Sequence, residues 1–220
     1  MLTNKRILIT QCHDFMGPTL VDTFRRLGAD VIASEPALNT PDAIEHLPTD
    51  LDAVVANLAI PAPRSPILDS TEDEWRETFS VLVDPLPRLV RRVVPGMIQR
   101  RGGKVLVMGS ASALRGMRNA STYSAARGAQ ISFVQAAGVE LARDGINLNI
   151  IAQNFVANPT YFPPEVQANP KFQARLDNEV PLGRLVSAEE DAQFAAYLCS
   201  DAANCFVGQV FPVCGGWVQR

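Results

Sequence analysis

In Ile7-Leu8-Ile9-Thr10-Gln11-Cys12-His13-Asp14-Phe15-Met16-Gly17, an apolar strand passes through a short turn into a predicted helix. Proteins that bind a dinucleotide place a glycine-rich turn at this junction, because the backbone must approach the pyrophosphate at the amino end of the helix. Here the turn has almost no glycine, and Phe15 stands where the close approach would occur. We therefore expect a dinucleotide-type fold whose turn does not hold the dinucleotide.

Short apolar runs alternate with longer stretches of helical period along the rest of the chain. Strands are predicted near residues 6–10, 30–34, 53–57, 104–109, 146–151 and 209–213. Helices are predicted near residues 17–27, 41–46, 72–99, 121–143 and 188–199. This alternation is typical of a doubly wound parallel sheet with helices on both faces. Because the chain has 220 residues, of which 47% are hydrophobic, we expect a single Rossmann-like α/β domain over residues 1–220.

Composition argues against several classes of function. The net charge of −3 is spread along the chain, so we expect neither a nucleic-acid partner nor a membrane surface. The four cysteines lack C-x-x-C spacing and the two histidines stand apart from other ligand residues, which predicts no metal site. The residues before the first strand are too few for a signal peptide, so a reducing cytoplasm is the expected compartment.

The segment 152–186 interrupts the alternation. It is rich in proline and has no clear strand, although a small helix is predicted around residues 165–176. Loops of this length in compact domains are usually functional. The segment leaves the carboxyl end of the strand predicted at 146–151, which is the edge where open α/β sheets bind ligands. We therefore predict that the loop 152–186 forms part of a binding site.

Three polar residues are predicted to meet at this edge. Ser110 closes the apolar strand 104–109, while Tyr123 and Arg127 are four residues apart and share one face of the next helix. A fixed positive charge favours a phenolate, so Arg127 is expected to lower the pKa of Tyr123. Tyr123 could then act as a general base toward an alcohol whose oxygen is held by Ser110. Arg127 keeps its own proton and is expected to act only through its charge.

The spacing Ser110-x12-Tyr123-x3-Arg127 resembles the serine and tyrosine pattern of the short-chain dehydrogenase/reductase superfamily, with arginine in place of the usual lysine. Together with Thr10-x4-Phe15-x-Gly17, it resembles the paired signature of halohydrin dehalogenases, a cofactor-independent branch of that superfamily.

The resemblance covers nearly the whole chain. The segment 51–57 resembles the superfamily's segment before the cofactor, and Gly215-Gly216-Trp217 resembles its carboxyl-terminal turn. Many members complete a proton relay with a helical asparagine, and the matching position here is Leu82.

The resemblance implies a specific reaction. In halohydrin dehalogenases the tyrosine takes the proton from the hydroxyl of a vicinal haloalcohol, and the alkoxide displaces the neighbouring halide to close an epoxide. The reverse reaction opens epoxides with small anions. The implied ligands are therefore a small haloalcohol or epoxide and a halide or other small anion, with no cofactor. The resemblance also implies a homotetramer that uses the helices near 72–99 and 121–143.

The implied halide pocket occupies the space that a nicotinamide fills in other members. The halide- and substrate-binding residues that the resemblance implies are Thr10, Phe15, Gly17, Gln153, Asn154, Phe155, Val156, Tyr161, Phe162, Pro163 and Pro164, while Ser112, Met117 and Ala120 are predicted for the substrate wall because they lie between Ser110 and Tyr123. Backbone N–H groups of the segment 153–156 are expected to donate to the anion. Gln153 and Asn154 stand where the superfamily normally has Pro-Gly.

Two other classes of function remain open at this point. Glu35 follows the second strand, where an acidic residue can bind an adenine ribose, and it favours a divergent NAD(P)-dependent oxidoreductase. Without the glycines of the turn, however, we interpret Glu35 as a surface residue. A non-enzymatic superfamily member that binds or regulates is the third hypothesis. Separately, Tyr161, Phe162 and Trp217 have a purely structural interpretation as core or subunit-contact aromatics.

Overall fold

The computed structural model describes residues 1–219. The strands of these residues form one six-stranded sheet. Its strands are β1 (Arg6–Ile9), β2 (Asp30–Ala33), β3 (Ala53–Ala56), β4 (Gly103–Ser110), β5 (Ile146–Gln153) and β6 (Val210–Val213). They are all parallel and lie in the order β2-β1-β3-β4-β5-β6. The order reverses at β1, so the gap between β1 and β3 is the switch point at which such sheets bind ligands. The expected α/β fold is confirmed.

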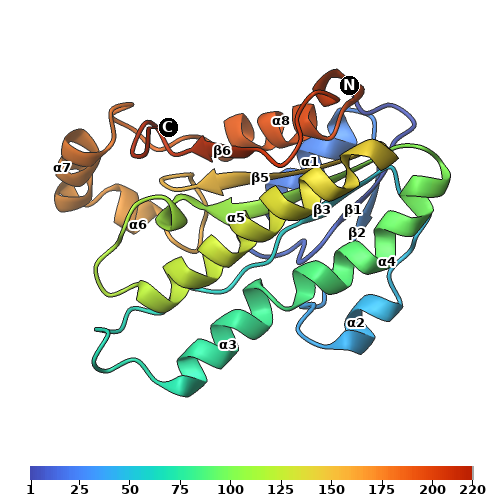
Figure 1. The fold of residues 1–220 in the computed structure, drawn as a ribbon. Coiled ribbons are helices and arrows are strands. Elements are labelled where there is room, and N and C mark those ends of the chain that lie inside the picture. Colours follow the sequence, from blue (N-terminus) through green and yellow to red (C-terminus); the bar gives the residue numbers. More distant parts are fainter. Residues whose placement is uncertain (220) are drawn as a thin grey trace.

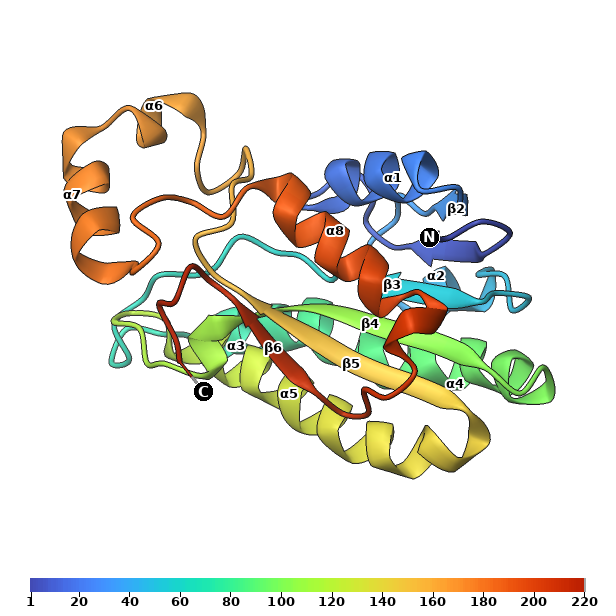
Figure 2. The same cartoon turned by 90° about the horizontal axis from the view of Figure 1, so that it is seen from above.

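Helices cover both faces of this sheet. They are α1 (Gly17–Arg26), α2 (Pro41–Glu45), α3 (Glu72–Leu82), α4 (Pro85–Gln99), α5 (Ser121–Leu141), α6 (Pro164–Gln167), α7 (Pro170–Glu179) and α8 (Ala188–Leu198). Figures 1 and 2 show α1 and α8 on one face and α3, α4 and α5 on the other, with α6 and α7 projecting at one end. Each face buries its own apolar cluster against the strands.

The helix predicted over 72–99 is divided in two. Helix α3 ends at Leu82 and α4 begins at Pro85, because a proline has no N–H to continue the hydrogen-bond ladder of the preceding helix. In the same way, the small helix predicted around 165–176 is divided at Pro170 into α6 and α7.

Two strands extend further than predicted at the edge that carries the site. Strand β4 includes Ser110, and β5 continues to Gln153 instead of ending at Ile151. The loop after β5 therefore starts at Asn154, and Gln153 is held in the sheet by its pairing with Ser110.

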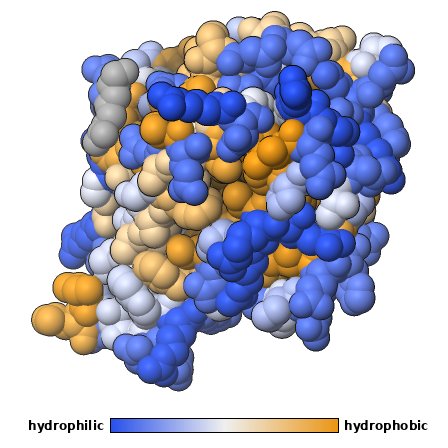
Figure 3. Space-filling model, turned by 45° about the vertical axis from the view of Figure 1, so that its right-hand side comes forward, coloured by the Kyte–Doolittle hydropathy of each residue, from blue (hydrophilic) through white to orange (hydrophobic). Residues whose placement is uncertain are grey.

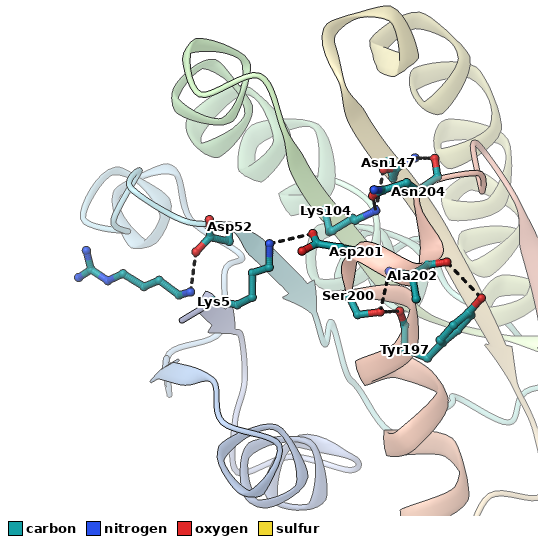
Figure 4. Close-up of polar contacts among 10 residues, drawn as sticks. Lys5, Asp52, Lys104, Asn147, Tyr197, Ser200, Asp201, Ala202 and Asn204 are labelled. Atoms are coloured by element: carbon teal, nitrogen blue, oxygen red, sulfur yellow. Dashed lines mark hydrogen bonds and ion pairs between the residues drawn. The ribbon is translucent and has the colours of Figure 1, made fainter. Parts of the chain in front are cut away.

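A buried lysine ties together the opposite, amino-terminal edge of the sheet. Lys104 at the start of β4 donates to Asn147 Oδ1 at 2.7 Å and to Asn204 Oδ1 at 2.5 Å (Figure 4). Burial lowers the pKa of Lys104. Its neighbour Asp201 is paired with Lys5 at 2.8 Å. This cluster joins β4, β5 and the segment after α8, far from the carboxyl ends of the strands.

Two findings bear on membranes and metals. Within residues 1–219, no helix is both long and apolar enough to span a bilayer. In the same part of the chain, His, Cys, Asp and Glu side chains nowhere gather in threes as a metal site would require. The four cysteines are free thiols.

Candidate functional site

A cavity of about 220 Å³ lies at the carboxyl ends of β1, β3, β4 and β5. It is therefore at the edge and switch point that the sheet topology favours. The predicted site residues that line it are Phe15, Ser110, Met117, Tyr123, Arg127, Gln153, Asn154, Phe155, Val156, Tyr161 and Phe162.

The other residues predicted for the site do not line this cavity. Thr10 is buried directly after β1, and Gly17 begins α1 at a position where an added Cβ would meet the backbone of the turn. Ser112 lies behind Ser110, and Ala120 is buried at the start of α5. Pro163 and Pro164 form the start of α6, beyond the lining residue Phe162.

The cavity wall also contains residues that the sequence did not single out. They are Met16, Asn57, Leu58, Ala59, Ala62, Arg64, Met108, Gly109, Asn158 and Arg175. Asn57 follows β3 just as Ser110 ends β4, so the rule that ligands bind at this edge could have found it. Arg64 and Arg175 come from the loop after β3 and from α7, where no motif or period marks them.

Ser110 presents its hydroxyl at the end of β4. The side chain is buried, and its Oγ lies 2.9 Å from the Oγ of Ser112. The backbone N–H of Ser112 also donates to Ser110 Oγ, at 3.2 Å. These contacts fix the hydroxyl at the cavity wall, where it can bind a substrate oxygen.

Tyr123 and Arg127 meet on one face of α5, as their spacing predicts. The guanidinium carbon of Arg127 is 5.0 Å from the centroid of the Tyr123 ring, so the charge lies over the ring. Arg127 Nη1 donates to the Met108 carbonyl and to Gln130 Oε1, both at 3.0 Å. The buried guanidinium is thus held by the backbone of β4 and by an amide.

Gln130 is a residue that sequence reasoning missed. It is fully buried, and its Nε2 donates to the Leu82 carbonyl at 2.6 Å, at the end of α3. Leu82, the position expected to match the relay asparagine, contributes its backbone oxygen to this bond. Gln130 follows Arg127 by three residues, so helical spacing alone could have marked it.

Tyr161 reaches over the cavity from the loop after β5. Its ring centroid lies 5.2 Å from that of Phe15, and its hydroxyl accepts a hydrogen bond from the Ala62 N–H at 2.8 Å. Burial raises the pKa of Tyr161, and the neighbouring Tyr123 raises it further. Tyr161 is therefore a neutral phenol at ordinary pH, and it closes the cavity on the side of the turn.

The turn after β1 has positive φ angles, which usually require glycine, at two residues that are not glycine. Gln11 and Phe15 have φ values of 44° and 47°, in the left-handed region that side chains rarely adopt. The Gln11 amide accepts from the Ala59 N–H at 2.9 Å and donates to the Ala59 carbonyl at 3.1 Å. Asn57 Nδ2 donates to the carbonyls of Gln11 and Asp14, at 2.9 and 3.0 Å. These bonds hold the strained turn against the segment after β3.

Two backbone N–H groups of the loop after β5 are hydrogen-bonded within the protein. The Asn154 N–H donates to the Val213 carbonyl at 3.1 Å, and the Phe155 N–H donates to Asn154 Oδ1 at 2.9 Å. The expectation that backbone N–H groups of the segment 153–156 donate to an anion is therefore wrong for Asn154 and Phe155, because both N–H groups are already hydrogen-bonded within the protein. Since Asn154 Oδ1 is occupied, its Nδ2 is the end of the amide left for a ligand.

A buried carboxyl lies directly behind the cavity wall. Asp191 of α8 is fully buried, and its Oδ2 accepts from Gln153 Nε2 at 2.5 Å. Its Oδ1 has no hydrogen-bond partner within residues 1–219. Burial raises the pKa of Asp191 to about 7, although the bond from Gln153 opposes this shift.

Asp191 should make the stability of the protein depend on pH. Its pKa rises from 3.8 to about 7 on folding, so its contribution is fully present below about pH 4 and is lost as the pH rises through 7. Asp191→Asn cannot ionise. As the pH rises from about 4 through 7, we therefore expect the free energy of unfolding of this variant to increase relative to that of the native chain, by up to about 4 kcal/mol. Urea unfolding at several pH values measures the difference, and a difference that does not change with pH would contradict the assignment.

Comparison with known proteins agrees with this architecture. The family model described as enoyl-(acyl carrier protein) reductase matches residues 17–218. The chain belongs to the short-chain dehydrogenase/reductase superfamily. The match begins at Gly17, directly after the turn Thr10–Met16, which contains no glycine.

Relatives in the superfamily include dehydrogenases. 2-Keto-3-deoxy-L-fuconate dehydrogenase of Xanthomonas campestris pv. campestris is 30% identical over 98% of this chain and 81% of that protein. Dehydrogenase/reductase SDR family member 6 of Danio rerio is 28% identical, over 98% of each chain.

The solved structures that resemble this chain include a protein described as a dehalogenation enzyme and a reductase. A protein described as a dehalogenation enzyme is 32% identical, with a TM-score of 0.90, over 99% of this chain and 100% of that chain. L-Sorbose reductase of Gluconobacter frateurii, solved with NADPH and L-sorbose, has the same TM-score at 22% identity, over 100% of this chain and 98% of that chain. At that identity the likeness shows the fold alone.

The superfamily implies a nicotinamide dinucleotide, and the turn of this chain does not fit one. A pyrophosphate needs open backbone at the turn. Here the Gln11 side chain crosses from the turn to Ala59, and Phe15 packs on Tyr161. Glu35 is an exposed residue whose carboxylate lies 3.2 Å from His13 Nε2. We therefore assign no residue of this chain to holding a dinucleotide.

Proposed function

We propose that the protein is a halohydrin dehalogenase, a carbon–halogen lyase that converts vicinal haloalcohols to epoxides without a cofactor. One observation carries the proposal: Ser110, Tyr123 and Arg127 line a cavity that Phe15 and Tyr161 close on the side of the turn. The 32% identity to a protein described as a dehalogenation enzyme supports it.

Tyr123 is the general base in this mechanism. Its phenolate takes the proton of the substrate hydroxyl, whose oxygen is held by Ser110 Oγ. The alkoxide oxygen forms a bond to the neighbouring carbon while the carbon–halogen bond breaks, and the halide leaves with the electron pair. Arg127 places a buried positive charge over the ring of this tyrosine, with its guanidinium carbon 5.0 Å from the ring centroid. One haloalcohol thus gives one epoxide, one halide and one proton.

The halide is proposed to leave toward Phe15 and the loop after β5. Among the residues of 1–219 that line the cavity, the charged ones are Arg64, Arg127 and Arg175 and none is a carboxylate, although Arg175 is paired with Glu179 at 3.0 Å. This balance of charge favours an anion. Asn154, whose Oδ1 accepts from the Phe155 N–H, is proposed to offer its Nδ2 as a donor without a charge, and the cavity of about 220 Å³ limits the substrate to a short chain.

Arg127→Lys should lower activity at neutral pH and displace the activity–pH profile toward alkaline values. Lysine keeps a positive charge but loses the planar group that donates to both Met108 and Gln130. The expected loss in the rate of halide release near pH 7 is about tenfold. Arg184→Lys is the matched control, since Arg184 pairs with Glu190 outside the cavity. An unchanged profile in Arg127→Lys would contradict the electrostatic role.

The activity itself is tested by incubating the protein with short vicinal chloro- and bromoalcohols. We expect equal release of halide and acid, with formation of the epoxide. If release stays at the level of the Tyr123→Phe variant for every such substrate, the proposal is wrong.

An NAD(P)-dependent oxidoreductase is the second candidate, and the dehydrogenases among the relatives favour it. Titration with NADH and NADPH separates the two functions. Our proposal expects no saturable binding. Saturable binding with an absorbance change linked to an alcohol or ketone would establish the oxidoreductase instead.

We also propose a homotetramer whose subunits meet through α3, α4 and α5. These helices form one face of the molecule, and Figure 3, turned toward α4 and α5, shows apolar side chains among polar ones. Trp75, stacked on Phe79 at 4.5 Å, is 43% exposed, and Val139 is 70% exposed. Sedimentation at micromolar concentration should show a tetramer, whereas a monomer would remove the proposal.

A further inference from the structure

We propose that Asp191 is a positioning residue that decides, through Gln153, which end of the Gln153 amide the cavity offers to an anion. Gln153 is the last residue of β5 and lines the cavity, while Asp191 lies behind it on α8. The inference rests on the halide site proposed above and names a regulator of that site.

With an ionised Asp191, the orientation of the amide is the one in the structure. Gln153 Nε2 donates to Asp191 Oδ2 at 2.5 Å, and a carboxylate can only accept. The amide nitrogen is therefore turned away from the cavity, and the carbonyl oxygen Oε1 is the end left for it. A carbonyl oxygen carries partial negative charge, so this state of the wall disfavours a halide.

Protonation of Asp191 favours the opposite orientation of the Gln153 side-chain amide. The neutral carboxyl carries a hydrogen that needs an acceptor, and Asp191 is fully buried, with no partner for Oδ1 within residues 1–219. Gln153 can supply that acceptor by turning its amide about the last side-chain torsion, which has two nearly equivalent orientations. Oε1 then accepts from the carboxyl O–H, and Nε2 faces the cavity as a donor to the halide.

The charged groups near Asp191 are already paired with one another. Glu189 and Glu190 directly precede it on α8, but Glu189 pairs with Arg26 of α1 at 2.7 Å, and Glu190 pairs with Arg184 at 2.8 Å. Burial and the bond from Gln153 are the influences on the pKa of Asp191, and no charged side chain of the described residues adds to them. With a pKa of about 7, the carboxyl changes its charge within the ordinary working range.

The direction of the effect suits the proposed reaction. Ring closure releases a halide and a proton, and a rising pH would ionise Asp191 and turn the acceptor end of Gln153 toward the halide. Alkaline conditions would therefore favour halide release and epoxide formation. Acidic conditions would favour anion binding and so the opening of epoxides.

The test measures bromide binding calorimetrically with sodium bromide at constant ionic strength, from about pH 5.5 to about pH 8.5. For the native chain we expect the affinity to fall about tenfold as the pH rises, the effect of losing one hydrogen bond to an anion. Asp191→Asn cannot ionise and should bind bromide with the same affinity throughout. Gln153→Met removes both ends of the amide and should bind weakly and independently of pH, which provides a second variant if Asp191→Asn does not fold.

The outcomes separate this inference from the proposed function. An equal fall of affinity with pH in the native chain and in either variant would overturn the role of Asp191 while leaving the halide site in place. No bromide binding by the native chain at any pH would overturn the halide site, and with it both proposals. Infrared difference spectra provide an independent readout, because a protonated carboxyl band that titrates near neutral pH should be absent from Asp191→Asn.

Discussion

Tyr123→Phe should lower the rate of halide release from a vicinal haloalcohol by about 10²- to 10⁴-fold, the usual contribution of a general base. The variant loses the phenol oxygen that takes the substrate proton. It keeps the ring over which the Arg127 guanidinium lies, at 5.0 Å from the centroid, so folding should be preserved. Halide release at saturating substrate measures the loss.

Tyr197→Phe is the matched control for this prediction. It also removes a phenolic hydroxyl, but Tyr197 lies on α8, and its hydroxyl donates to the Ala202 carbonyl at 3.4 Å, outside the cavity. We expect its activity to match that of the native protein. Similar losses in the two variants would show that Tyr123 has no special part in the chemistry.

Gly17→Ala should destabilise the fold by about 3 kcal/mol, the cost of overpacking a close backbone contact. A Cβ atom at this position would lie 2.5 Å from the carbonyl carbon and oxygen of Cys12, and 2.6 Å from the Gln11 carbonyl oxygen. These are backbone atoms of the strained turn, so no side-chain rotation relieves the contact. Urea unfolding measures the loss of free energy.

Gly116→Ala is the control for Gly17→Ala. An added Cβ at Gly116 meets no atom within 4 Å, so its stability should stay close to that of the native chain. If Gly17→Ala were as stable as Gly116→Ala, the turn would have room to move away from α1. That result would contradict the claim that the turn packs tightly against Gly17.

Local sequence patterns predicted most of the fold. Apolar runs marked the strands, and helical period marked α8, which the structure shows to begin with a capping box of Ser187 and Glu190. The break between α3 and α4 was harder, because proline does not always end a helix. Pro95 lies inside α4 without ending it, whereas Pro85 begins a new helix. Tertiary packing decides between these two outcomes, and a single sequence does not contain it.

The candidate site was predictable where its residues are joined by short spacing. Tyr123 and Arg127 meet on one helix, and Ser110 ends the strand before it. The contact between Gln153 and Asp191 spans 38 residues of sequence, so no local pattern could have paired them. The use of the Asn154 and Phe155 N–H groups within the protein likewise depends on how the loop folds back on itself and on β6.

The central claim is that the space a nicotinamide would fill serves a halide in this chain. A crystal soaked in bromide and measured at the bromine absorption edge tests it most directly. The account predicts an anomalous peak in the cavity, beside Phe15 and the segment Gln153–Val156. A cavity without such a peak, together with ordered nicotinamide dinucleotide in crystals grown with NADH or NADPH, would contradict it.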